Sequence, residues 1–164
     1  MPANRRSPSR LPLPTEKDFD PWGGDLDAQS AWKNFGGLDL EQAYLKFCDN
    51  PLCYQEDFMF MGARAFQFYF PVVEKYFHEV KNDDDSVSGD SGDCQAWILG
   101  ECLKTQLEQK ELLADHPLLA RINDLAAYVR GHLSQYSGSP ADQAQINEVW
   151  LALENRLAEI RRPR

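Results

Sequence analysis

The sequence predicts an all-α protein, a single domain of about five helices around an aromatic central helix. In the C-terminal third, apolar residues recur at steps of three and four, which is the spacing of one helix face. The segment 58–80 is rich in aromatic residues and carries two adjoining apolar faces, as a buried helix does. The 164 residues, 43% of them apolar, are ample for one globular domain.

The N-terminal part of the chain is expected to be irregular. Residues 1–18 contain repeated prolines and no apolar period, which predicts a disordered or extended arm. The helical domain is then expected to cover residues 19–162. In its first part, Trp22 and Trp32 stand among glycines and aspartates, with one short helix near residues 28–35. These tryptophans are expected either to cover the core or, where exposed, to form a partner site.

A first regular helix is expected after Asp39. This residue is a typical N-cap, and Gln42 stands at the position that returns the capping hydrogen bond. The helix is expected to end at Asn50, because the residue before a proline, here Pro51, is disfavoured in the α region.

The central segment 58–80 has two interpretations. As a helix, it should be kinked or divided at Pro71, which has no amide hydrogen to donate. Alternatively, the alternating pattern at 66–70 and a turn at 62–64 fit a β-hairpin. The helical period continues over 72–80, and this favours the helix.

The remaining segments predict a loop and three helices. The segment 82–93 is polar, acidic and rich in glycine and serine, so it is expected to be a loop, followed by a helix beginning near Asp93. Apolar stripes over 118–133 and 146–160 predict two further helices, the second with Ser139 as its N-cap. Their short connection predicts an antiparallel helix hairpin at the C-terminus.

The charge is distributed unevenly and excludes several function classes. The whole chain has a net charge of −9, and the two ends, residues 1–17 and 156–164, each carry +3. Residues 18–155 therefore carry a net charge of −15. Such a body repels phosphate backbones, and nucleic-acid binding is not expected.

No segment is apolar enough to span a membrane. The first residues lack the apolar core of a secretory signal, which predicts a cytoplasmic protein with reduced cysteines.

No catalytic residue, metal site or cofactor site is predicted. Ser91 lies in a Gly-Asp-Ser-Gly sequence, but its acidic surroundings would oppose a developing oxyanion. The loop 82–93 lacks the final carboxylate of an EF-hand, although loose binding of a divalent cation stays open. Cys48, Cys94 and Cys102 lie beside apolar stripes and are expected to be buried thiols.

One set of polar residues allows an enzymatic alternative. Arg64 stands within the aromatic run, where a buried guanidinium would need a carboxylate partner such as Glu56 or Asp57. Glu74 and His78 share one helix face at a spacing of four residues. An enzyme of unrecognised type would have Arg64, Glu74 and His78 at a pocket beside the central helix.

Two short stretches carry a resemblance. Glu56-Asp57-Phe58 and the aromatic run 65–73 resemble a pattern in small uncharacterised bacterial proteins. They are also similar to segments of acidic immunity proteins, cytosolic antidotes that bind a cognate toxin. The resemblance implies a bacterial source and a binding role, and it brings no catalytic residue.

The leading expectation is therefore a non-enzymatic acidic domain, an immunity protein or adaptor, that blocks or holds a basic protein partner. A homo-oligomer formed through the C-terminal helix is a further possibility, and the oligomeric state stays open. The residues expected to meet the partner are Asp83, Asp84, Asp85, Asp90, Asp93, Trp22 and Trp32.

Overall fold

The computed structural model describes residues 11–80 and 95–162 of the chain. Every regular element in these two ranges is helical, which confirms the all-α class and excludes the hairpin at 58–70. The α-helices are α1 (Glu16–Phe19), α2 (Leu26–Phe35), α3 (Leu40–Asp49), α4 (Pro51–Tyr54), α5 (Asp57–Phe60), α6 (Ala63–Glu79), α7 (Ala96–Gln106), α8 (Lys110–Leu113), α9 (His116–Gly131) and α10 (Pro140–Arg161), and a 3₁₀ turn, η1, covers Leu133–Gln135. The described ranges hold more helices than the five expected, because four single-turn helices, α1, α4, α5 and α8, accompany the six longer ones.

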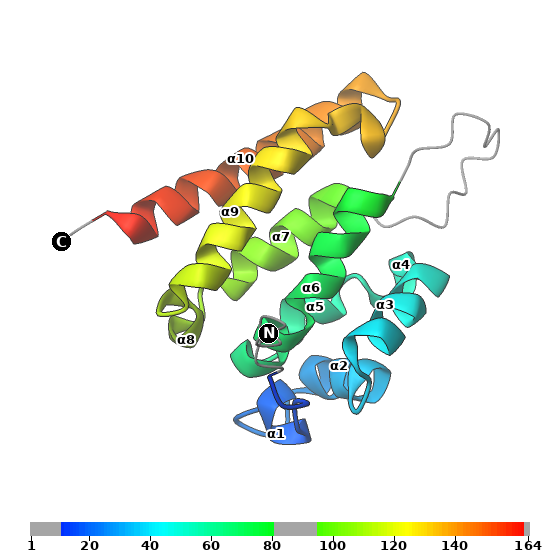
Figure 1. The fold of residues 1–164 in the computed structure, drawn as a ribbon, viewed down its shortest axis with the longest axis vertical. Helices are drawn as coiled ribbons and strands as arrows, with labels where there is room; N and C mark the ends of the chain where they lie inside the picture. The colour runs from blue at the N-terminus through cyan, green and yellow to red at the C-terminus, as the bar shows by residue number, and fades with distance from the viewer. Residues whose placement is uncertain (1–10, 81–94, 163–164) are drawn as a thin grey trace, which may run out of the picture.

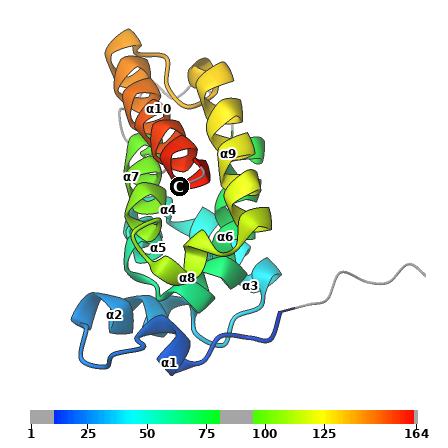
Figure 2. The ribbon, with the colours of Figure 1, turned by 90° about the vertical axis from the view of Figure 1, so that its left-hand side faces the viewer.

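Helix α6 lies at the centre of the molecule (Figure 1). It packs against α1 and α3 on one side and against α7, α8 and α9 on the other. The buried residues of α6 form the two adjoining faces that the sequence predicts. Figure 2, turned by 90°, shows α1 and α2 at one end and α9 and α10 towards the other.

The central segment is interrupted at Gly62 and not at Pro71. Helix α5 ends at Phe60, and the amide of Gly62 donates to the carbonyl oxygen of Phe19 at 2.8 Å. A Cβ atom at this glycine would lie 2.2 Å from the carbonyl oxygen of Asp18. Pro71 lies inside α6 without dividing it, because burial of both helix faces outweighs one missing hydrogen bond. The close approach of α1 therefore decides where the helix begins.

The predicted capping signals are confirmed. Asp39 and Gln42 bond reciprocally at the start of α3, and α3 ends before Pro51. The hydroxyl of Ser139 accepts from the amide of Asp142 at the start of α10. Helices α9 and α10 then form the expected antiparallel pair (Figure 1).

The N-terminal boundary differs from the expectation. Helix α1 begins at Glu16, inside the segment 1–18 that was expected to be an arm. The Thr15 side chain caps this helix by accepting a hydrogen bond from the amide of Asp18, and the Asp18 carboxylate accepts one from the amide of Thr15. The predicted loop 82–93 lies outside the described residues. No helix of the described ranges is both long and apolar enough to cross a membrane.

The core has two halves of different composition. In the aromatic half, built by α1–α5 against α6, ring centres lie 5.0–5.9 Å apart. Its fully buried rings are Phe19, Phe35, Phe47 and Phe58, with Tyr69 of α6. In the aliphatic half, built by α7–α10, most of the buried side chains are branched aliphatics. They include Leu99, Leu103, Ile122, Leu125, Val129, Leu153 and Leu157, joined by Trp150.

Candidate functional site

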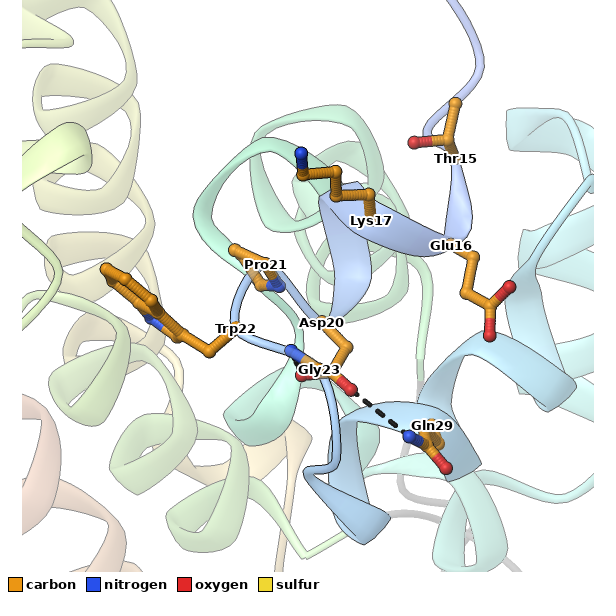
Figure 3. Close-up of a pocket in the computed structure, with 8 residues that line it drawn as sticks. All are labelled: Thr15, Glu16, Lys17, Asp20, Pro21, Trp22, Gly23 and Gln29. Carbon is orange, nitrogen blue, oxygen red and sulfur yellow. Dashed lines mark hydrogen bonds between the residues drawn. The ribbon is translucent and has the colours of Figure 1, made fainter.

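A pocket of about 480 Å³ lies where α1 and the following turn meet α2 (Figure 3). It is lined by Thr15, Glu16, Lys17, Asp20, Pro21, Trp22, Gly23 and Gln29. Its lining holds two carboxylates and one exposed indole, and it has no cysteine or histidine.

The carboxylate of Asp20 links the turn and α2 on one side of this pocket through hydrogen bonds. It accepts hydrogen bonds from the amide of Gly23 at 3.1 Å and the amide of Asp25 at 3.3 Å. It also accepts a hydrogen bond from the side-chain amide of Gln29 at 3.3 Å (Figure 3). The side chain is consequently buried, with 8% of the residue exposed. Gly23 and Gly24 adopt φ of 73° and 89°, which suits glycine. The turn is thus held in one conformation.

The two tryptophans named as partner residues have different environments. Trp22, at the tip of the turn, is 94% exposed. Trp32 is half-buried, with its ring centre 5.4 Å from that of Phe19 in an edge-to-face contact. Trp32 therefore covers the core, and Trp22 is free to meet another molecule.

Among residues 11–80 and 95–162, the acidic side chains around the pocket form no ion pair. Residues 16–27 contain five carboxylates and one lysine, a net charge of −4. In the described part of the chain, the carboxylates that form ion pairs are Glu74, Glu101, Glu154 and Glu159, on α6, α7 and α10. The site is thus suited chemically to cationic groups and to N–H donors.

Arg64, Glu74 and His78 are not brought together at a pocket. Arg64 is exposed, so the expected buried ion pair with Glu56 or Asp57 is wrong. Ten residues of α6 separate it from Glu74, a distance of about 15 Å along the helix axis. Glu74 binds the guanidinium of Arg121 on α9 at 2.6 Å, and the His78 ring lies 4.1 Å from that of Tyr128.

The three cysteines that the structure describes, Cys48, Cys53 and Cys102, form no metal site. Cys48 and Cys53 are exposed, which corrects the expectation of a buried thiol at Cys48. Cys102 is buried as expected, and burial raises the pKa of its thiol to about 12. Within residues 11–80 and 95–162, no group of histidine, cysteine and acidic side chains is placed to hold a metal ion. Asp83, Asp84, Asp85, Asp90, Asp93 and Cys94 lie outside these ranges.

Sequence reasoning missed the burial of four polar residues, Asp20, Gln55, Asp57 and Gln106. Asp20 stands before a Pro-Trp-Gly-Gly turn, and that turn composition is a signal that could have identified it. Asp57 and Gln106 are also buried, but no local pattern distinguishes them from surface residues of a helix.

What the site does has to be inferred from its own geometry. No protein-family model, curated protein or solved structure was found to match this chain.

Proposed function

We propose that the protein is a non-enzymatic binding module that presents a negative surface to a basic protein partner. In this role it blocks or holds the partner, as an immunity protein or an adaptor does. The observation that carries the proposal is the 94% exposure of Trp22 beside carboxylates that form no ion pair within the described part of the chain.

The chemistry of this surface favours a partner rich in arginine or lysine. An exposed indole is a large, rigid contact surface, and its face attracts a guanidinium or ammonium group. The net charge of −4 over residues 16–27 would accelerate the encounter with a basic protein and make binding sensitive to salt. Because Asp20 already holds the turn in place, little conformational entropy is lost when Trp22 is covered.

The experiment is capture of partners from extracts of the native cell at low and high salt. The full-length wild type is compared with Trp22→Ser and with Leu151→Ser. Leu151 is a suitable control because it is also exposed, at 37%, and α10 lies away from α1 and α2 (Figure 2). Nuclease treatment of the extract excludes capture through nucleic acid.

We expect the wild type to recover one basic protein at low salt and much less of it at high salt. Trp22→Ser should lose at least tenfold of this capture, and Leu151→Ser should retain it. Recovery of no partner at either salt concentration contradicts the proposal. Equal capture by wild type and Trp22→Ser would also contradict it, since Trp22 would then lie outside the binding surface.

A further inference from the structure

Asp57 is a buried carboxylate at the place where α2, α3 and α5 meet. The residue is 8% exposed, and its carboxylate accepts a hydrogen bond from the side-chain amide of Asn34 on α2 at 2.8 Å. The ammonium group of Lys46 on α3 donates to the backbone carbonyl oxygen of Asn34 at 2.6 Å. Asn34 is thus held by α5 through its side chain and by α3 through its backbone.

The surroundings of Asp57 favour its neutral form. Burial raises the pKa of Asp57 to about 6, and it outweighs the hydrogen bond from Asn34 and the charge of Lys46, which both lower that pKa. The neighbouring carboxylate of Glu56 raises it further. Helix α7 packs against α5 and carries the Glu101 carboxylate, which is paired with Lys104 at 3.3 Å, and the buried Cys102 thiol, whose pKa is raised by burial and also by Glu56 and Asp57.

We propose that Asp57 makes the attachment of α2 to the body of the molecule dependent on pH: ionisation of its carboxyl group loosens the contact between α2 and α5, and protonation tightens it. This inference does not depend on the proposed function, although α2 borders the pocket that carries Trp22.

The direction follows from proton linkage. When α2 opens, Asp57 meets water and its pKa returns to its ordinary value of about 4. The closed state therefore binds the proton more tightly than the open state does. The resulting stabilisation of the closed state is fully present below about pH 4, and it is lost as the pH rises through the closed-state value of about 6. The opening equilibrium of α2 should therefore increase about tenfold between pH 5 and pH 7.5.

The test is hydrogen exchange of the α2 amides in the full chain at pH 5 and pH 7.5, with each rate divided by the intrinsic rate at that pH. Wild type is compared with Asp57→Asn, which has nearly the same shape as the protonated acid. Asp49→Asn, an exposed aspartate at the end of α3, is the control. We expect an increase of about tenfold in wild type and in Asp49→Asn, and less than twofold in Asp57→Asn. Equal increases in all three proteins overturn the proposal.

Two measurements keep the proposal testable if Asp57→Asn does not fold. In Lys46→Met, loss of the cation that lowers the pKa of Asp57 should raise the closed-state pKa, so that opening continues to increase up to a higher pH before it levels off. In the wild type, NMR titration of the Asp57 carboxyl carbon should give a midpoint near 6. A midpoint near 4, or opening in Lys46→Met that levels off at the same pH as in the wild type, shows that Asp57 does not control this contact.

Discussion

The aromatic and aliphatic halves of the core achieve burial in different ways. In the aliphatic half, long helices pack through periodic branched side chains, and Trp150 donates from its indole nitrogen to the carbonyl oxygen of Ala96 at 3.0 Å. In the aromatic half, three of the five helices are single turns, and large rings fill the space between them. Here polar side chains bind backbone carbonyl groups at the ends of helices and in the turns that follow them.

Two contacts illustrate the second arrangement. The hydroxyl of Tyr69 lies 2.8 Å from the carbonyl oxygens of both Phe35 and Leu38. The side-chain amide of Gln106 donates to the carbonyl oxygens of Phe58 and Met61 at 2.8 and 2.9 Å. A single helical turn cannot satisfy its own carbonyl groups, so distant side chains must do so. The comparison shows that short helices depend on the rest of the fold in a way that long helices do not.

The largest expected effect comes from removing a ring of the aromatic half. Phe58 is fully buried between Phe35 and Phe47, with ring centres at 5.5 and 5.4 Å. Phe58→Ala should lower the free energy of unfolding by about 4 kcal/mol, and Leu153→Ala in the aliphatic half by about 3 kcal/mol. Urea denaturation measures both. A cost below about 1 kcal/mol for Phe58→Ala would show that the rings are not tightly packed.

The next effect concerns the close approach of α1 to the start of α6. Gly62→Ala should destabilise the protein by about 3 kcal/mol, because the new Cβ atom would meet backbone at 2.2 Å. Gly131→Ala is the matched control, since nothing lies within 4 Å of its added atom. It should stabilise α9 by about 0.5 kcal/mol. Thermal unfolding of both variants distinguishes a local clash at residue 62 from a general effect of alanine. Similar changes in Tm for the two variants would contradict the predicted clash.

A smaller effect is expected from the polar support of α5. Gln106→Leu keeps the side-chain size but removes the side-chain donor to the buried carbonyl group of Phe58, while Met61 keeps the bond from Gln109 at 3.2 Å. This loss should cost about 2 kcal/mol. Gln67→Leu is the control, because this half-buried glutamine bonds only to the side chain of Asp115, and its loss should cost less than about 1 kcal/mol. Equal costs in chemical denaturation would show that Gln106 acts only through its volume.

The smallest effect is expected at the ion pair that crosses from α9 to α6. The side chains of Arg121 and Glu74 remain 44% and 28% exposed, so water screens their attraction. Arg121→Gln should cost about 0.5 kcal/mol at low salt and less at high salt. Measuring the free energy of unfolding at both salt concentrations tests this, and a cost above about 2 kcal/mol would place this contact among the main supports of the fold.

The sequence predicted the long helices well and the short ones poorly. The cap at Asp39, the end of α3 before Pro51 and the cap at Ser139 were all predicted from residues within four positions of each other. Helices α1, α4, α5 and α8 are four residues long, which is too short for an apolar period to repeat. Local caps are present at α1, where Thr15 and Asp18 bond reciprocally, and at α4, where Asn50 accepts from the amide of Cys53. Helices α5 and α8 have no side-chain cap and depend on packing against distant parts of the chain.

The candidate site was predicted only in part. Trp22 was named from its residue type, since tryptophan is enriched at interfaces, but its separation from Trp32 required the fold. The exposure of Arg64 was not foreseen either, because its aromatic neighbours suggested burial. In the sequence, the exposed side of α6 cannot be distinguished from its buried sides, because aromatic residues stand close to Arg64 along the chain. Which residues of α6 remain exposed depends on where the neighbouring helices pack.

The sequence by itself determined the helical class, the two apolar faces of the central helix and the caps of the long helices, because these depend on neighbours along the chain. The tertiary structure decided the break at Gly62, the burial of Asp57 and the exposure of Trp22. Each of these depends on which distant backbone or side chain occupies the adjoining space, and no local pattern of residues specifies that.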